Sequence, residues 1–234
     1  MTERQKVVNA LAMLKGIGEG SSDHKRIIKT FNDSKLCTRY EMTTKDSWCA
    51  TAVSYAFIVS KLAGKQGSGK VFQCVECSCA KMVELGKKQG IFVESDSYVP
   101  KMGDVIFYDW QDSGEGDNKG TPDHVGIVEY VNGDYIHVIE GNKNDAVGER
   151  TVKVNGKYIR GFIVPKYKTV KYYPAYNGSS TSIVDALKAV GVENPTLLFR
   201  RKIAKANDIS NYVGTAAQNI KMLVMLEKGK LIQP

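Results

Sequence analysis

Histidine is scarce in this sequence, and long apolar runs are absent. Only three histidines occur among 234 residues, so few side chains can exchange a proton near neutral pH. No stretch reaches the 18 or more apolar residues that a membrane-spanning helix requires. Residues 1–6 are charged and lead into no apolar run typical of a signal peptide. We therefore expect a protein made in a cytoplasm and not bound to membranes, which needs another route out if its target lies outside the cell.

Acidic residues are scarce in the last third of the chain. Residues 1–165 carry 22 Lys/Arg and 21 Asp/Glu, a net charge of +1, whereas residues 166–234 carry 11 and 4, a net charge of +7. A basic tail on a near-neutral body predicts contact with a polyanion. Aromatic and basic residues do not alternate as in nucleic-acid binders, so we expect no nucleic acid and favour anionic wall polymers such as teichoic acids. A merely solvated basic surface is the alternative.

Cysteines are few and odd in number, which disfavours a framework of disulfides. The five are Cys37, Cys49, Cys74, Cys77 and Cys79. A structural zinc site needs four ligands, and the last three cysteines would need Cys37 to complete one. We therefore expect this cluster to pack locally near a helix start, and Cys49 is the candidate nucleophile.

Apolar spacing predicts an α+β domain followed by a helical tail. Helical patterns precede Pro100, whereas β-branched and aromatic runs separated by turn residues follow it, which indicates helices packed on an antiparallel sheet. The expected helices cover 3–15, 24–31, 48–62 and 79–85, with Asp46-Ser47 capping the third. The expected strands cover 104–108, 124–131, 135–140, 151–154 and 158–164.

A stretch rich in turn residues separates the tail from the first domain. We assign residues 1–167 to the α+β domain, 168–180 to a linker, and 181–234 to a small, mainly helical domain. The expected tail helices cover 183–190, 200–206 and 216–226. A domain this small is marginal alone, so docking or homo-oligomerisation is expected to support it.

Cys49 lies at the predicted start of a helix, where partial positive charge and free N–H groups favour a thiolate. A small buried cysteine would look the same, so position alone does not establish a nucleophile. A catalytic thiol also needs a base within hydrogen-bond reach, oriented by a third group. His124 opens a predicted strand, and Glu140 closes the strand that pairs with it.

The register of this hairpin decides whether His124 and Glu140 can act together. A two-residue Asn-Gly turn would place their side chains on opposite faces of the sheet. A three-residue loop at 132–134 places His124 opposite Asn142, and Glu140 opposite Gly126, which leaves room for it. All three polar side chains then share one face, and we predict this register.

The other two histidines are weaker candidates. The same register places His137 opposite Glu129 as an exposed cross-strand pair, so we expect it to be structural. His24 lies in a polar helical segment, and we expect it at the surface.

Four motifs, taken in order, carry a resemblance to a known family. They are Asp46-Ser47-Trp48-Cys49-Ala50, Gly103-Asp104-Val105-Ile106, Asp123-His124-Val125-Gly126-Ile127-Val128 and Ile139-Glu140-Gly141-Asn142. The combination resembles the CHAP family of cysteine, histidine-dependent amidohydrolases/peptidases, which is related to NlpC-type and papain-like proteases. The resemblance covers roughly residues 1–167 and is to the catalytic domains of phage endolysins from Gram-positive hosts.

The resemblance implies a papain-like or NlpC-like fold and a bacteriolytic peptidoglycan hydrolase. Such an enzyme cuts an amide bond in the peptide part of the wall, as an N-acetylmuramoyl-L-alanine amidase or an endopeptidase, after release from the host cytoplasm. It implies Cys49 as nucleophile, His124 as base and later acid, Glu140 to orient His124, and Asn142 as a further polar site residue. The Cys49 N–H is the expected oxyanion donor, and Trp48 is expected to contact substrate. A non-catalytic wall-binding or phage structural protein that kept the fold is the alternative.

An acidic, glycine-rich stretch partly resembles a calcium loop. Its positions 1, 3, 5 and 9 carry oxygen side chains, but position 12 is Gly120, where such loops have Glu. The chemistry requires no cofactor, and this stretch leaves calcium possible, with a rim loop of the substrate cleft as the favoured interpretation. The candidate ligands are Asp109, Gln111, Ser113 and Asp117.

The tail resembles small C-terminal domains that follow endolysin catalytic domains, at residues 183–187, 201–207 and 214–219. This implies a cell-wall-binding domain, with charges that only solvate a helix as the alternative. The residues expected at the wall are Arg200, Arg201, Lys202 and Lys205.

Overall fold

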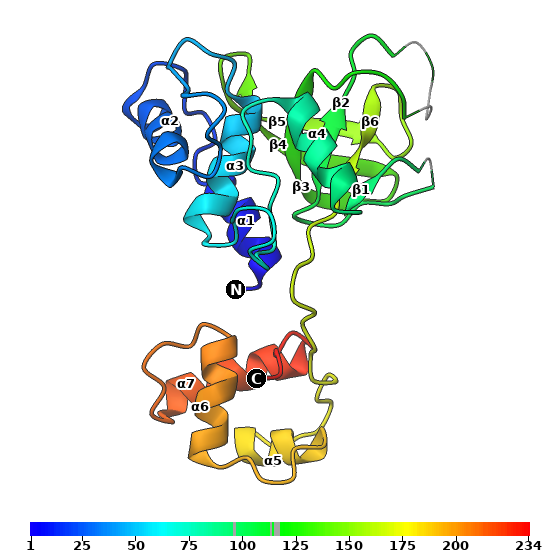
Figure 1. Cartoon of the computed structure of the whole chain (residues 1–234). Coiled ribbons are helices and arrows are strands. Elements are labelled where there is room, and N and C mark those ends of the chain that lie inside the picture. Colours follow the sequence, from blue (N-terminus) through cyan, green and yellow to red (C-terminus); the bar gives the residue numbers. More distant parts are fainter. Residues whose placement is uncertain (96, 113, 115–117) are drawn as a thin grey trace. The chain divides into compact units, whose positions relative to one another are not determined.

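The chain divides into two compact units in a computed structural model (Figure 1). One unit spans Glu3–Tyr167, and the other combines Met1–Thr2 with Lys168–Pro234. The structure describes residues 1–95, 97–112, 114 and 118–234. Within these ranges no helix is both long and apolar enough to cross a membrane.

The larger unit has the α+β fold expected from the sequence, which is confirmed. Its helices are α1 (Glu3–Ala12), α2 (Ser22–Ser34), α3 (Cys49–Val59) and α4 (Cys79–Lys88). Its strands are β1 (Phe92–Val93), β2 (Val105–Tyr108), β3 (His124–Asn132), β4 (Tyr135–Lys143), β5 (Ala146–Lys153) and β6 (Ile159–Ile163). They pair antiparallel in the order β1-β6-β2-β3-β4-β5. The short β1 was not predicted, and β5 begins earlier than the predicted 151.

Helix α3 is enclosed on all sides. Its residues 49–57 are buried, because α1 and α2 pack on one side of it and β3 and β4 on the other (Figure 1). A helix that is apolar all round requires such enclosure. Gly141 of β4 permits the close approach, since a Cβ atom there would lie 2.3 Å from the Cβ of Ala52. The packing therefore fixes α3 directly against the two strands that carry His124 and Glu140.

The start of α3 differs from the prediction. Trp48 occupies the N-cap position, and no side chain in the described part of the chain caps the helix. Asp46 instead accepts hydrogen bonds from the backbone N–H and the hydroxyl of Thr43, each at 2.7 Å. The predicted Asp46-Ser47 cap is therefore wrong, and the first N–H groups of α3 are not used by a capping side chain.

The β3–β4 hairpin has the predicted register near the site but a different turn. Asn132 pairs with Tyr135, so the connection is the two-residue turn Gly133-Asp134 and the predicted three-residue loop is wrong. A β-bulge just after Val128 then shifts the register by one residue, so that Val128 pairs with Val138. The bulge supplies the residue that the shorter turn lacks, and the predicted pairing is recovered toward His124.

The bulge also changes the partner of His137. Its ring lies opposite Tyr130 rather than Glu129, and the two rings stack with centroids 4.2 Å apart. The ring nitrogen Nδ1 lies 3.2 Å from the hydroxyl of Thr151. The predicted Glu129 pair is therefore wrong, and His137 packs between neighbouring strands on the sheet surface.

His24 is fully buried, which contradicts its predicted surface position. Its ring lies against the ring of Trp48, with centroids 4.7 Å apart, and its Nδ1 accepts the N–H of Gly20 at 2.9 Å. Burial lowers the pKa of His24, so the ring is held in its neutral form.

The smaller unit contains α5 (Ile183–Ala189), α6 (Leu197–Ala206) and α7 (Ala216–Glu227), close to the predicted ranges. Side chains of Ser182, Thr196 and Thr215 cap these helices. The segment predicted as a linker contributes to the core of this unit, because Tyr173 and Tyr176 are buried in it. Part of 168–180 is thus packed structure.

Candidate active site

Cys49 is the first residue of α3, and only 6% of it is exposed. The backbone N–H of Ala50 helps to lower the pKa of the thiol, as a helix N-terminus allows. His124, the first residue of β3, contacts the same sulfur. The packing of α3 on the sheet therefore brings together two residues that are far apart in the sequence.

Glu140 holds the His124 ring from β4. Its carboxylate oxygen Oε2 lies 3.2 Å from Nε2 of His124, and the carboxylate is fully buried. Gly126 makes room for it, since a Cβ at Gly126 would lie 2.8 Å from Cγ of Glu140. Because Nε2 faces Glu140, Nδ1 is the nitrogen left to exchange a proton with the Cys49 sulfur. The shared face predicted for these side chains is what the structure shows.

Arg150 completes the support for Glu140, and the sequence analysis missed it. Its Nε donates to the second carboxylate oxygen of Glu140 at 2.7 Å. The guanidinium also lies over the rings of Trp110 and Tyr108, 4.8 and 5.3 Å from their centroids. Arg150 belongs to β5, but the predicted strand began one residue later, at 151, and so did not include it. The pairing of β5 with β4 is the feature that could have revealed it.

Cys79 is a second sulfur at the site, also missed by the sequence analysis. Its Sγ lies 3.7 Å from Sγ of Cys49, and both cysteines are buried. Cys79 is the first residue of α4, whose cap is Ser78. Two helix N-termini therefore meet at one pair of sulfurs, which no spacing within the sequence would reveal.

The electrostatics favour a thiolate–imidazolium pair. Contact with the Cys79 thiol, and then with His124, lowers the pKa of Cys49 well below its usual value against the opposing effect of burial. Burial alone would lower the pKa of His124, but contacts with Cys49 and Glu140 outweigh it and raise the pKa to about 9. Between these two pKa values the sulfur is deprotonated and the ring is protonated.

The pKa values of Cys79 and Glu140 shift in the directions that support this ion pair. Contact with Cys49, burial and the charge of Asp123 raise the pKa of Cys79, so Cys79 keeps its proton and can donate it to the Cys49 thiolate. Burial opposes ionisation of Glu140, but hydrogen bonds from His124 and Arg150 lower its pKa. Glu140 therefore stays an anion and stabilises the charged imidazole.

Asn142 lies beside these residues, as predicted. It has φ of +56°, at an irregularity in β4 between Glu140 and Lys143, and its buried Oδ1 has no hydrogen-bond partner among the described residues. It lines a cavity of about 270 Å³ together with His124 and Arg150. An orphaned acceptor beside a nucleophile is suited to receive an N–H group of a bound molecule.

Trp48 does not fit its predicted role at the substrate. Its side chain has no exposed surface, and its indole N–H donates to Glu19 at 3.2 Å. It packs against His24 and under Gly141, so its role is to support the start of α3.

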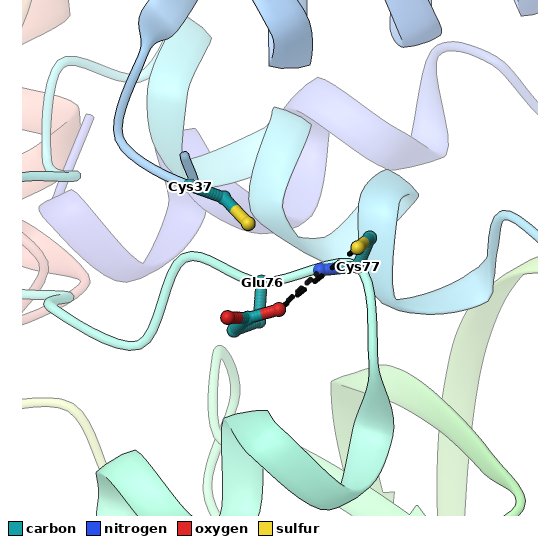
Figure 2. A group of neighbouring side chains, drawn as sticks. All are labelled: Cys37, Glu76 and Cys77. Atoms are coloured by element: carbon teal, nitrogen blue, oxygen red, sulfur yellow. Dashed lines mark hydrogen bonds between the residues drawn. The ribbon is translucent and has the colours of Figure 1, made fainter. Parts of the chain in front are cut away.

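Cys37, Cys74, Cys77 and Cys79 do not form a four-thiol zinc site. Cys74 is buried beside Gln89, whereas Cys37 and Cys77 lie with Glu76 in a group whose ligand atoms are within 4.8 Å of one another (Figure 2). Arg39 already supplies a cation to this group, since its Nη2 lies 3.0 Å from Glu76 and 3.4 Å from the Cys77 sulfur. Burial raises the pKa of Cys77 to about 11, which keeps the thiol protonated. The Glu76 carboxylate and the Cys77 sulfur thus already have a cationic partner.

The calcium prediction is only partly within the described residues, because Ser113 and Asp117 lie outside them. Asp109 accepts the backbone N–H of Gln111 at 2.9 Å. The Gln111 amide nitrogen, when turned toward the carboxylates, donates to Asp109 and Asp123 at 2.8 Å each. In that arrangement Gln111 offers donors rather than a ligand oxygen, and calcium binding stays a prediction.

The four basic residues expected at the wall differ in their surroundings. Arg200 is tied down within the smaller unit, because its Nε donates to the Tyr212 hydroxyl and its Nη1 to the Pro195 carbonyl. Arg201 and Lys205 are exposed and line a common cavity of about 370 Å³, and Lys202 is also exposed. The exposed three remain candidates for binding an anionic polymer.

A buried cysteine ion-paired with a histidine that a carboxylate orients is the arrangement of thiol-dependent hydrolases. Residues 39–142 match the model of the CHAP domain family, and this stretch contains Cys49, His124, Glu140 and Asn142. This stretch of the chain, a little under half of its length, is therefore similar to a CHAP domain.

The crystal structure of Ly7917 with the hydrolysing product of MDP aligns with 74% of this chain and 68% of that one, at 15% sequence identity and a TM-score of 0.36. No curated protein matches the sequence.

Proposed function

We propose that this protein is a cysteine-dependent peptidoglycan hydrolase that cuts an amide bond in the peptide part of a Gram-positive cell wall. The observation that carries the proposal is the connected series Cys49–His124–Glu140 inside a stretch similar to a CHAP domain, with a lowered thiol pKa at one end and a fully buried carboxylate at the other. Both an N-acetylmuramoyl-L-alanine amidase and an endopeptidase would use this chemistry.

The first half-reaction forms an acyl-enzyme. The Cys49 thiolate attacks the carbonyl carbon of the scissile amide, and the carbon–oxygen π electrons move to the oxygen to give a tetrahedral oxyanion. The backbone N–H of Cys49 at the uncapped start of α3 is the proposed donor to this oxyanion. His124 then gives its proton to the leaving nitrogen, the carbon–nitrogen bond breaks, and a thioester remains on Cys49.

The second half-reaction regenerates the thiolate. Neutral His124 takes a proton from a water molecule, which attacks the thioester carbonyl. When the second tetrahedral intermediate collapses, the carbon–sulfur bond breaks, the acid product leaves, and the thiolate–imidazolium pair is restored. Glu140 stabilises the protonated form of His124 in both half-reactions because it stays ionised, and Arg150 fixes the orientation of Glu140.

The tail supports a role in localising the enzyme on its insoluble substrate. Exposed Arg201, Lys202 and Lys205 give the smaller unit a cationic surface suited to anionic wall polymers such as teichoic acids. A weak binder tethered to a hydrolase raises the effective concentration of substrate around the active site. Together the two units suit a phage endolysin released from the host cytoplasm.

The deciding experiment compares wild type, Cys49→Ala and His124→Ala on purified Gram-positive walls. We expect each variant to lower the rate of turbidity loss by about a thousandfold or more. Cys74→Ala is the matched control, because it removes a buried thiol away from the site. Mass spectrometry of the released fragments identifies the new termini and separates amidase from endopeptidase. Equal clearing by wild type and Cys49→Ala would disprove the thiol mechanism.

The second candidate is a wall-binding or phage structural protein that kept the fold without catalysis. The exposed basic residues of the smaller unit favour wall binding in either case. This alternative would be supported if the wild-type protein bound cell walls from several Gram-positive sources but cut none of them.

A further inference from the structure

The cavity beside His124 has a composition that the reaction alone does not explain. Its described lining residues are Trp110, His124, Asn142, Lys143, Asn144 and Arg150. Two of these are basic residues, two are amides, and none carries a carboxylate. We propose that this cavity is a subsite for a free carboxylate of the peptide substrate, next to the scissile amide; this rests on the proposed function.

Arg150 is the first donor to such a carboxylate. Its Nε is used by Glu140 at 2.7 Å, while its terminal nitrogens make no hydrogen bond to a residue that the structure describes. The guanidinium is held in a fixed plane by Glu140 and by the ring of Trp110, 4.8 Å from its carbon. A pre-oriented guanidinium edge binds a carboxylate by two parallel hydrogen bonds.

Lys143 supplies the second cation. It is the last residue of β4 and pairs with Ala146 across a two-residue turn, in which Asn144 and Asp145 both have positive φ. Gly148 on β5 gives its stem a place to lie, since a Cβ there would be 3.2 Å from the Cδ of Lys143. The tight hairpin therefore fixes the backbone of Lys143 at the rim of the cavity, while its terminal ammonium group can move to meet a ligand.

The charge balance leaves the subsite cationic. The positive charges of Arg150 and His124 are balanced by the negative charges of Glu140, which contacts both residues, and of the Cys49 thiolate. Lys143 is then the surplus cation. The Asp123 carboxylate accepts the backbone N–H of Trp110 at 2.8 Å and is not among the described residues that line the cavity. An anion entering the cavity is thus attracted by its lining.

The remaining lining residues suit a peptide that bears this carboxylate. The buried Oδ1 of Asn142 lacks a partner among the described residues and can accept a peptide N–H. Trp110 is 37% exposed and offers an aromatic surface to the peptide backbone. The ligand class is therefore a short peptide with a free carboxylate close to the amide that is cut.

The test compares two ligands that differ only at the carboxylates. N-acetylmuramoyl-L-alanyl-D-glutamate, in which both glutamate carboxylates are free, and its counterpart in which both are amidated are titrated into Cys49→Ala, which cannot turn over, by calorimetry. We expect the free acid to bind about tenfold more tightly, and Lys143→Met in the same background to reduce that preference to about twofold or less. Lys153→Met is the matched control, because Lys153 is exposed at the other end of β5.

Equal binding of acid and amide by Cys49→Ala would overturn the subsite, even if wild type clears cell walls and the proposed function stands. A preference for the acid that survives Lys143→Met unchanged would also overturn it, because the surplus cation on which the subsite rests would then make no contribution to carboxylate binding. A preference that Lys143→Met removes and Lys153→Met keeps supports the subsite, even if wild type cuts no wall and the proposed function fails.

Discussion

Replacing Cys79 with alanine should raise the pH at which Cys49 ionises. The Cys79 sulfur lies 3.7 Å from that of Cys49, and its raised pKa keeps a proton available for donation. A hydrogen bond to a charged group contributes about 1.5–3 kcal/mol, and each 1.36 kcal/mol corresponds to about one pH unit in an ionisation midpoint. Loss of this donor should therefore move the midpoint upward by about one pH unit or more.

The assay is the rate of Cys49 alkylation by iodoacetamide as a function of pH, followed by mass spectrometry of the peptide that contains Cys49. Only the thiolate reacts, so the midpoint of the rate profile reports its ionisation without requiring hydrolysis. Cys79→Ser should keep the midpoint near that of wild type, because the hydroxyl is also a donor. Cys74→Ala is the control for loss of a buried thiol, since burial raises the pKa of Cys74 to about 12 and it contacts Gln89 instead.

An unchanged midpoint in Cys79→Ala, with the variant folded by circular dichroism, would refute the reasoning. It would mean that His124 and the start of α3 stabilise the thiolate without help from the second sulfur. A similar upward shift in Cys74→Ala would mean that any cavity near α3 perturbs the site, and the specific role of Cys79 would be lost.

Four further predictions test other parts of the structure. Glu140→Gln should lower kcat/KM about tenfold or more and move the alkaline limb of its pH profile to lower pH, because His124 (pKa about 9) loses the anion that favours its charged form. An alkaline limb at the wild-type pH would contradict this. His137→Ala should leave turnover within about twofold of wild type, and a loss comparable to that of His124→Ala would contradict its placement. Burial lowers the pKa of His24, so its stabilising effect is present above pH ~6.5 and is lost as the pH falls through the lowered value; His24→Phe should flatten the decline in urea midpoint between pH 7 and 5, and a parallel decline would exclude His24 as its cause. Removing residues 168–234 should weaken sedimentation with walls while cleavage of soluble fragments persists, whereas unchanged sedimentation would remove the tail's role.

Local patterns in the sequence were sufficient for most elements and for four catalytic candidates. Apolar periodicity located the helices and most strands, since a buried face imposes its own spacing on the chain. The scarcity of histidine left few bases for Cys49, and side-chain alternation along β3 and β4 put His124, Glu140 and Asn142 on one face. The register held near the site even though the predicted loop was wrong, because a bulge compensated for the shorter turn.

The tertiary structure decided what surrounds that catalytic series. Cys79 and Arg150 reach the site from α4 and β5, and His24 and Trp48 are buried beneath it. Local sequence assigned no role to Arg150 and favoured other roles for the other three. Contacts between segments distant in sequence depend on how helices pack on the sheet, and neither composition nor periodicity encodes that distance. The sequence by itself determined which residues could carry the chemistry; only packing determined which neighbours set their charge and position, because electrostatic and hydrogen-bond effects act across a few ångströms of space rather than along the chain.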